Sequence, residues 1–230
     1  MADMAPYTPP AEPVGGRLKR GIDLAVAVPL LVATSPLMAA LAVWVRRDSP
    51  GPALFRQERT GFAGRPFTLL KFRSMVDGAV NMGSGLRVTS TDDRITRSGR
   101  LMRKLSLDEL PQLINIVRGD MSLIGPRPTM PFHMERYDAT QMKRLDARPG
   151  VTGLAQIRGR NTIPWSVRLR HDVEYVERWT PWTDLRIVWG TILVVLRGSG
   201  TYDDSKPVFD LPERPAPADP PAAPPTPTDG

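Results

Sequence analysis

The feature that most constrains this 230-residue chain is an apolar run of 25 residues, from Gly21 to Val45. About 20 apolar residues are enough for a helix to cross the hydrocarbon core of a bilayer. Basic residues flank the run at both ends, and positive charge favours the cytoplasmic side of a membrane. We therefore expect both ends of the run to stay on that side. The flanking residues are Arg17, Lys19, Arg20, Arg46 and Arg47.

Thr34, Ser35 and Pro36 lie near the middle of the run. A proline removes one backbone hydrogen bond and kinks a helix, while neighbouring hydroxyls can satisfy the carbonyl that it frees. Asp23, close to one end, is costly at membrane depth and favours the interface. Two arrangements fit these observations. Residues 17–47 form either a re-entrant helix-break-helix, broken at Ser35 and Pro36, or a tilted transmembrane helix kinked at Pro36.

Proline-rich segments stand at both ends of the chain and are predicted to be disordered. Residues 1–16 and 206–230 hold few apolar side chains, so burial cannot offset the entropy of ordering them. The last 25 residues contain nine prolines. Between these ends, residues 48–205 are long enough to form one domain of ordinary size with its own core.

Positive charge is concentrated in the body of the chain. Each proline-rich end carries −2, so a chain of net charge +7 holds +11 between residues 17 and 205. A basic body indicates an anionic partner: nucleic acid, an anionic membrane surface or a phosphorylated substrate. The chain has no cysteine, which excludes disulfides, thiolate metal sites and thiol catalysis. With only two histidines, His133 and His171, a histidine-rich metal site is not expected.

The periodicity of residues 48–205 predicts a mostly helical α+β domain with short strands. Residues 53–57 and 66–75 are predicted strands around a turn at residues 61–64. A short apolar run covers residues 121–124, and residues 154–157 are predicted to be a brief strand or turn. Helices are expected at residues 92–104, 107–117, 131–145, 166–178 and 185–196.

Lys71 and Arg73 share one face of the second predicted strand. Two readings fit this pair. They project together to bind phosphate, or they form a solvated basic edge that protects the strand from aggregation.

The last predicted helix, residues 185–196, is apolar but too short to span a bilayer. Trp179, Trp182 and Trp189 favour an amphipathic helix that lies in the headgroup region, because indoles prefer that interface. A buried core helix is the alternative.

Two adjacent carboxylates, Asp108 and Glu109, stand among many cations. Ser106 and Glu109 also have the spacing of a capping box, which is a purely structural alternative. Neighbouring helical residues point about 100° apart, so the two carboxylates would have different roles. One could attack a phosphorus atom while the other holds a hard cation such as Mg²⁺. The surrounding cations are Arg94, Arg97, Arg100, Arg103, Lys104, Arg118 and Arg127.

The segment Gly125-Pro126-Arg127-Pro128 follows the acidic pair in the chain. Its prolines fix φ on both sides of Arg127, so the guanidinium is presented with little entropy to lose. Arg160, in a basic turn, is another exposed fork suited to phosphate oxygens. Together with the acidic pair, these residues outline a diphosphate site beside a membrane.

Six separated motifs occur in an order that resembles the bacterial sugar transferases. These are the monotopic phosphoglycosyl transferases that begin the assembly of surface glycans, and the resemblance covers roughly residues 17–202. It is closest to the small type without an N-terminal multi-span module. The motifs are KRGIDL, KFRSM, RLMRKLSLDELPQL, GDMSLIGPRP, RPGVTGLAQIRGRN and HDVEYV.

The resemblance implies a reaction at the cytoplasmic face of the bacterial inner membrane. Sugar-1-phosphate passes from a UDP-sugar to polyprenyl (undecaprenyl) phosphate and UMP is released. By the same resemblance, residues 17–47 are the membrane-dipping helix, broken at Ser35 and Pro36. Residues 48–205 are the cytoplasmic catalytic domain. The bilayer and downstream glycosyltransferases are further expected partners, and nucleic acid is not.

The resemblance also implies roles for particular residues. Asp108 is the nucleophile that forms a covalent phosphosugar intermediate, and Glu109 supports it. Mg²⁺ is the expected cofactor, with Asp108 and Glu109 as its candidate ligands. By motif position, the substrate and phosphate contacts are Arg103, Pro126, Arg127, Pro128 and Arg160. Lys71 and Arg73 are added as candidates because of the strand pattern described above.

A second hypothesis is a non-catalytic, membrane-anchored basic module that binds anionic lipid or nucleic acid. It predicts steeply salt-dependent binding to polyanions and indifference to the loss of Asp108. It leaves the acidic pair and the Pro-Arg-Pro segment without a function.

Overall fold

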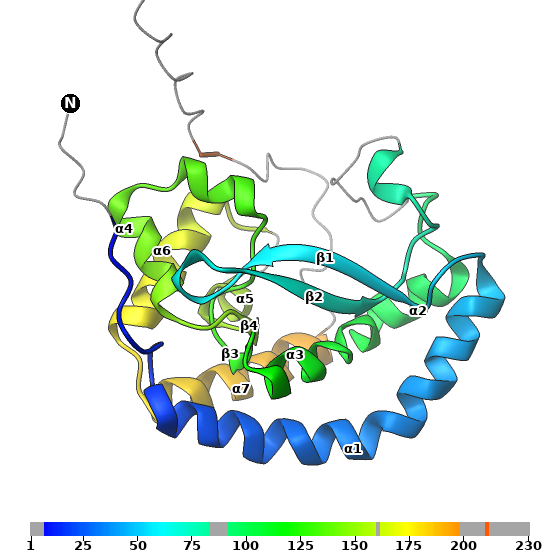
Figure 1. The fold of residues 1–230 in the computed structure, drawn as a ribbon, viewed down its shortest axis with the longest axis horizontal. Helices are drawn as coiled ribbons and strands as arrows, with labels where there is room; N and C mark the ends of the chain where they lie inside the picture. Colours follow the sequence, from blue (N-terminus) through cyan, green and yellow to red (C-terminus); the bar gives the residue numbers. More distant parts are fainter. Residues whose placement is uncertain (1–6, 83–91, 160–161, 198–209, 212–230) are drawn as a thin grey trace, which may run out of the picture.

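The computed structural model describes residues 7–82, 92–159, 162–197 and 210–211, and shows a mostly helical α+β fold (Figure 1). One long helix lies along a small domain of short helices and four short strands. The strands are β1 (Leu54–Thr60), β2 (Pro66–Phe72), β3 (Ser122–Ile124) and β4 (Gly150–Thr152). The helices are α1 (Gly16–Asp48), α2 (Arg97–Lys104), α3 (Gln112–Arg118), α4 (Ala139–Met142), α5 (Leu154–Arg158), α6 (Trp165–Glu177) and α7 (Pro181–Arg197).

The predicted hairpin is confirmed. Strands β1 and β2 pair antiparallel in a register that runs from Leu54 opposite Phe72 to Thr60 opposite Pro66. The turn between them contains Ala63 at φ 56°, a left-handed conformation that tight turns use. A second, parallel pair joins β3 to β4, with Ser122 opposite Gly150. This parallel pair brings the segment before the Pro-Arg-Pro loop next to the start of α5.

Helix α1 packs against the domain with a single stripe of residues. Its buried positions recur about every four residues, which places them on one side of the helix. They are Lys19, Asp23, Ala27, Leu41 and Val45. The opposite side is apolar and exposed, with Leu18, Ile22, Val26, Val28, Leu30, Val32, Leu37, Val43 and Trp44 among its residues.

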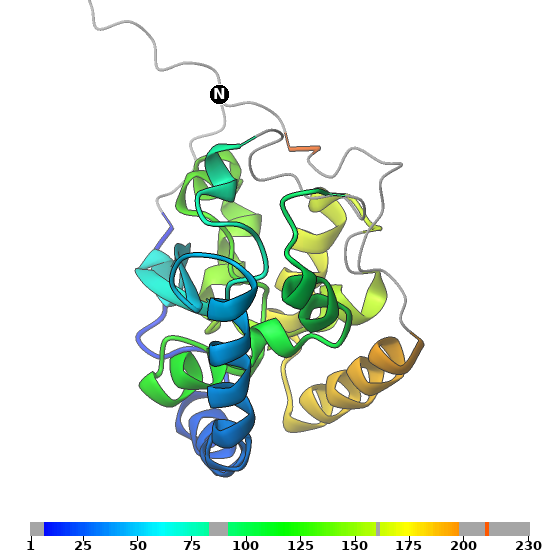
Figure 2. The ribbon, with the colours of Figure 1, turned by 90° about the vertical axis from the view of Figure 1, so that its right-hand side faces the viewer.

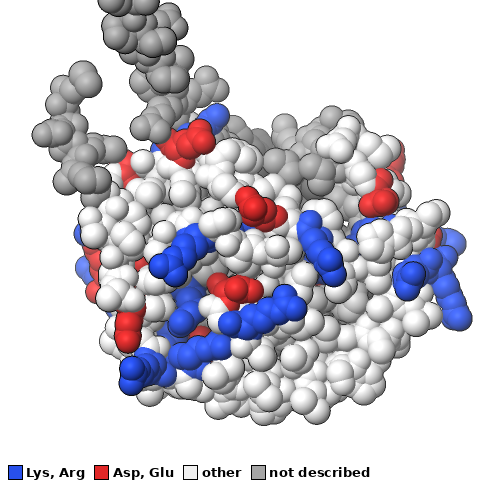
Figure 3. Space-filling view, in the orientation of Figure 1, with Lys and Arg blue, Asp and Glu red and all other residues white. Residues whose placement is uncertain are grey.

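Within the described residues, α1 is the one helix long and apolar enough to cross a membrane. Only 11% of its most apolar window is buried. Figure 3 shows the corresponding lower edge of the molecule without charged side chains, with Lys and Arg gathered near either end. An exposed apolar surface of this extent marks a contact with lipid or another protein.

The predicted break at Ser35 and Pro36 is not an interruption of the helix. Helix α1 is continuous from Gly16 to Asp48 and curves around the domain (Figure 1). Pro36 cannot donate to the carbonyl of Val32, and the Ser35 hydroxyl donates to that oxygen instead, at 2.8 Å. The predicted repair by a neighbouring hydroxyl is therefore confirmed, and it allows the helix to pass through the proline.

Both ends of α1 are tied to the same domain. Near the start, Arg20 donates to the carbonyls of Ile116 and Val117 at the end of α3. At the other end, a carboxylate oxygen of Asp48 accepts from the Ser98 amide at 2.8 Å. Both ends of the apolar helix are thus hydrogen-bonded to the domain.

Asp23 anchors the first half of α1 from inside the protein. It is 2% exposed, and one of its oxygens accepts from the Ser122 hydroxyl and the Leu123 amide, both at 3.0 Å. The expectation that Asp23 lies at a membrane interface is corrected here. A buried carboxylate needs hydrogen bonds. Asp23 obtains them from β3 and so connects α1 to that strand.

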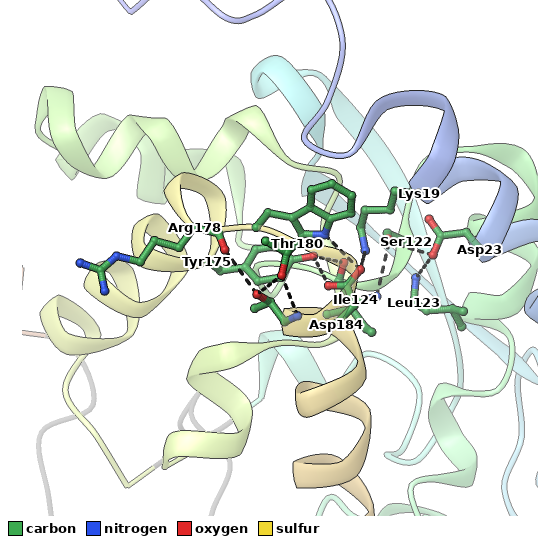
Figure 4. A network of polar contacts seen from close by, with 11 residues as sticks. Lys19, Asp23, Ser122, Leu123, Ile124, Tyr175, Arg178, Thr180 and Asp184 are labelled. Atoms are coloured by element: carbon green, nitrogen blue, oxygen red, sulfur yellow. Dashed lines mark hydrogen bonds and ion pairs between the residues drawn. The ribbon is translucent and has the colours of Figure 1, made fainter.

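A second polar network connects α1 to α6 and α7 (Figure 4). The Lys19 ammonium lies 2.5 Å from a carboxylate oxygen of Asp184. Tyr175 donates to the other Asp184 oxygen at 2.8 Å, and the Trp179 indole donates to the same oxygen as Lys19 at 3.1 Å. The Tyr175 hydroxyl also lies 3.2 Å from the Ile124 carbonyl, just before the Pro-Arg-Pro loop.

We expect Asp184→Asn to lower the free energy of unfolding by about 2 to 3 kcal/mol, because it leaves the buried Lys19 ammonium without its counter-charge. Urea unfolding of the detergent-solubilised protein, followed by near-ultraviolet circular dichroism, measures this change. Asp93→Asn, at an exposed position, is the control and should change stability by less than about 0.5 kcal/mol. Equal midpoints for the two variants would contradict a structural role for the network.

The predicted disordered ends need a partial correction. Residues 7–16 lie against the domain: the Tyr7 hydroxyl donates to Asp146 at 2.6 Å, and the Val14 amide donates to the carbonyl of the same residue. Near the other end, Asp210 accepts from the Ser166 amide and Leu211 is buried. The remaining residues of 1–16 and 206–230 lie outside the described parts of the chain.

Two other segments differ from their predicted forms. Residues 131–145, predicted as one helix, form two 3-10 turns on either side of the four-residue α4. Residues 154–157, predicted as a strand or turn, belong to helix α5. The helices predicted at 166–178 and 185–196 are confirmed as α6 and α7.

Candidate active site

The acidic pair lies on a single 3-10 turn, Leu107–Glu109, between α2 and α3. The chain reverses through Ser106, which has φ 57° and makes no side-chain cap bond. The capping-box reading is therefore wrong: the Glu109 amide donates to the Ser106 carbonyl at 3.3 Å and not to its hydroxyl. Leu107 and Leu110 pack into an apolar cluster with Phe72 and fix the turn.

Glu109 is the anion of a three-residue ion cluster. One of its oxygens lies 2.7 Å from the Lys71 ammonium and 3.0 Å from the Arg127 guanidinium. Burial raises the pKa of Glu109, but the two cations outweigh it and hold the pKa well below its ordinary value. Glu109 is thus ionised at every physiological pH and positions both cations.

Asp108 has a different environment. Its side chain is mostly buried, and no described residue donates a hydrogen bond to its carboxylate. Burial raises the pKa of Asp108, while the charges of Lys71 and Arg103 oppose that rise. A carboxylate that accepts no hydrogen bond from the described residues and lies near cations has lone pairs available for attack on an electrophile.

Both carboxylates line a cavity of about 350 Å³. Its wall also carries six basic side chains, and such a cluster in a partly water-excluded site favours a phosphorylated ligand. The six are Arg59, Lys71, Arg103, Arg127, Arg144 and Arg168. Burial, and to a smaller extent the nearby Arg127, lower the pKa of Arg59 to about 10.

The Pro-Arg-Pro loop is held through its backbone carbonyls. The Gly150 amide donates to Pro126 at 2.9 Å, and Arg144 donates to the carbonyl of Arg127 at 2.7 Å. Arg144 is itself held by two hydrogen bonds to Asp172, at 2.8 and 3.0 Å, in a fully buried pair. The side chain of Arg127 remains 50% exposed and reaches Glu109. A rigid backbone thus carries an accessible guanidinium.

The amino-acid sequence that forms this cavity matches a known protein family. Residues 14–198 match the family described as bacterial sugar transferase. The chain belongs to the bacterial sugar transferase family. It is therefore an enzyme, a transferase of the phosphoglycosyl class.

Relatives of the transferase share much of its length. A sugar transferase of Bacillus subtilis, EpsL, is 44% identical over 183 residues, which cover 80% of this chain and 89% of EpsL. The UDP-glucose:undecaprenyl-phosphate glucose-1-phosphate transferase of Caulobacter vibrioides is 42% identical, over 80% of this chain and 72% of that protein. The undecaprenyl-phosphate galactose phosphotransferase of Salmonella typhimurium is also 42% identical, over 80% of this chain and 42% of that protein.

The structure brings some of the predicted site residues of the transferase together. Asp108, Glu109, Lys71, Arg103, Arg127 and Pro128 all line the cavity. Pro126 lies next to it and contributes its carbonyl to the bond with β4. Arg160 lies outside the described residues.

Arg73 does not join them. It is 4% exposed and donates to the carbonyls of Ser49 and Pro50, beyond the end of α1. The shared-face prediction for Lys71 and Arg73 fails because β2 ends at Phe72, so the strand alternation no longer applies to the next residue. Arg73 ties α1 to the hairpin rather than lining the site.

Sequence reasoning missed several cavity residues. Arg144 and Asp172 lie 28 positions apart in the chain. They meet because α6 packs against the 3-10 turn Lys143–Asp146. Arg59 stands on β1 among other charged residues, and nothing in its neighbourhood distinguishes it. Trp165 and Arg168 open α6, where a predicted helix gave no reason to assign them to a site.

The carboxylates fit the expected magnesium cofactor. Mg²⁺ is usually held by one or two carboxylates together with substrate phosphate oxygens. Asp108 accepts no hydrogen bond from a described residue, and only one oxygen of Glu109 contacts cations. No group of three or more acidic or histidine side chains that could hold a metal occurs in the described part of the chain. Asp108 and Glu109 would therefore hold the ion together with a bound diphosphate.

Proposed function

We propose that this transferase moves a sugar-1-phosphate from a UDP-sugar to undecaprenyl phosphate, as the first membrane step of surface glycan assembly. The observation that carries the proposal is the Asp108 carboxylate, which accepts no hydrogen bond from a described residue and lies beside Glu109 in a cavity lined by cations. Two relatives, the Caulobacter and Salmonella transferases, are named for undecaprenyl phosphate, which supports the choice of acceptor.

The reaction proceeds in two displacements. An oxygen of Asp108 attacks the phosphorus that bears the sugar, the bond to the UMP oxygen breaks, and UMP leaves with the bond electrons. A phosphate oxygen of the acceptor then attacks the same phosphorus and releases the Asp108 carboxylate. Lys71, Arg103 and Arg127 neutralise the charge that develops on the transferred and leaving phosphates. Mg²⁺ bound with the diphosphate would add to that neutralisation.

The membrane arrangement that we propose is monotopic. Helix α1 would dip into the cytoplasmic leaflet of the inner membrane with its outer apolar face and return, because both of its ends are bound to one domain. Helix α7 would lie in the headgroup region, where the exposed Trp182 and Trp189 prefer to be. Such a placement holds the cavity at the height of a lipid phosphate.

The release of UMP from a panel of UDP-sugars tests the proposed reaction. We expect one or more donors to yield UMP in multiple turnovers only when undecaprenyl phosphate and Mg²⁺ are both supplied. A protein that binds vesicles but releases no UMP from any donor would instead support the non-catalytic basic module.

The acid dependence of the first displacement should report the environment of Asp108, which must be ionised to attack. Lys71 favours the charged form and lowers the pKa of Asp108. We therefore expect Lys71→Met to move the acid limb of the single-turnover rate to higher pH, in addition to lowering the plateau. Rapid-quench measurement of UMP release between pH 4 and 8 gives the limb. An unchanged or lower midpoint would contradict the assignment of Asp108 as the ionising group.

A further inference from the structure

The cavity that holds Asp108 has a second, apolar end. One part of its wall carries the acidic pair and the cations, while another part is formed by β4, α5 and α7. That second part consists of Val151, Thr152, Ala155, Gln156, Ile157, Thr191 and Val194.

The two threonine hydroxyls at this end already have hydrogen-bond partners within the protein. The Thr191 hydroxyl donates to the Ile187 carbonyl at 2.8 Å. The Thr152 hydroxyl lies 2.7 Å from the Thr191 hydroxyl. Neither hydroxyl therefore needs a ligand to satisfy it. Both amide atoms of Gln156 are buried, and neither has a hydrogen-bond partner among the described residues. Apart from Gln156, the wall here offers a sugar or a nucleoside few hydrogen-bonding groups, because Val151, Ala155, Ile157 and Val194 are apolar.

Helix α7 separates this apolar end from the outside of the molecule by its own thickness. Its inner stripe runs through Ile187, Thr191 and Val194, and its outer stripe runs through the exposed Leu185 and Trp189. Figure 2 shows α7 at the margin of the domain, on the same lower side as α1. The cavity is thus about 10 Å, one helix diameter, from the apolar outer face of α7.

We infer that the apolar end of the cavity, formed by α5 and the inner stripe of α7, binds the first isoprene units of the lipid acceptor. This inference rests on the proposed function. The acceptor phosphate lies at the cationic end beside Asp108, and its chain passes along α7 toward the bilayer. A single cavity with one charged end and one apolar end matches a lipid phosphate, whose charge and hydrocarbon are separated in the same way.

The two displacements allow this subsite to be tested separately from donor chemistry. Val194→Trp fills the apolar end. We expect the burst of UMP from the donor alone to stay within about twofold of wild type, while transfer from the preformed adduct to undecaprenyl phosphate slows at least tenfold. Val188→Trp makes the same substitution at an exposed position of α7 outside the cavity and should leave both steps within about twofold.

A milder variant covers the case in which Val194→Trp fails to fold. Val194→Ala keeps the cavity open and should raise the KM for undecaprenyl phosphate about threefold without changing the burst. Equal losses in both steps would mean that the apolar end binds the donor. Unchanged transfer in both Val194 variants would contradict the proposed subsite. A wild-type protein that shows no burst with donor alone would contradict the proposed function itself, independently of the subsite.

Discussion

Asp108→Asn is expected to reduce UMP release from the UDP-sugar donor by at least about 10³-fold, because the amide cannot attack phosphorus and cannot be regenerated as a leaving carboxylate. The comparison requires saturating undecaprenyl phosphate and Mg²⁺. Asp93→Asn makes the same change at an exposed site away from the cavity and should retain wild-type turnover.

The same substitution should not weaken the fold. Burial raises the pKa of Asp108 in the folded protein, so the ionised carboxylate costs stability at any pH above that pKa. A neutral amide removes this cost at neutral pH, and we expect the Asn variant to unfold at an equal or higher urea concentration. An Asp108→Asn variant that has lost turnover but is as stable to urea as wild type would show that Asp108 has a catalytic role and not a structural one. Ordinary turnover in the Asn variant would show that another residue is the nucleophile.

Arg127→Ala is expected to lower the rate of the first displacement by about 10²-fold to 10³-fold. The guanidinium is presented by a loop fixed at the carbonyls of Pro126, Arg127 and Pro128, so it reaches the diphosphate with little entropy to lose. Its removal also takes one of the two cations from Glu109. Single-turnover UMP release measures the effect on the chemical step.

Two further variants sharpen this result. Arg127→Lys keeps the charge but loses the planar fork, and should recover only part of the rate. Arg118→Ala, at an exposed position outside the cavity, is the matched control and should be as active as wild type. Equal activity of Arg127→Ala and Arg118→Ala would show that the Pro-Arg-Pro loop does not contact the reacting phosphates.

Local patterns predicted those parts of the fold that local physics determines. The hairpin followed from alternation around a glycine turn, and α6 and α7 followed from their helical periods. The parallel contact of β3 with β4 was not predicted, because each strand has three residues and the partners lie more than 20 positions apart. Short strands of this kind are specified by the packing around them and not by their own composition.

The candidate site shows the same division. Asp108, Glu109 and Arg127 were recognisable because their residue types and backbone context are unusual in sequence. The Arg144–Asp172 pair was not, since a buried ion pair is defined by tertiary contacts alone. Ser106 and Arg73 were misread for a related reason: the first has a left-handed backbone and the second lies past the end of its strand.

The intact mass of the purified protein after incubation with a UDP-sugar and Mg²⁺, without acceptor, tests the central claim most directly. We predict one added sugar phosphate per chain, mapped to Asp108 by peptide analysis, with one UMP released for each adduct. Addition of undecaprenyl phosphate should return the protein to its original mass. No adduct, or UMP release only when the acceptor is present, would contradict transfer through Asp108.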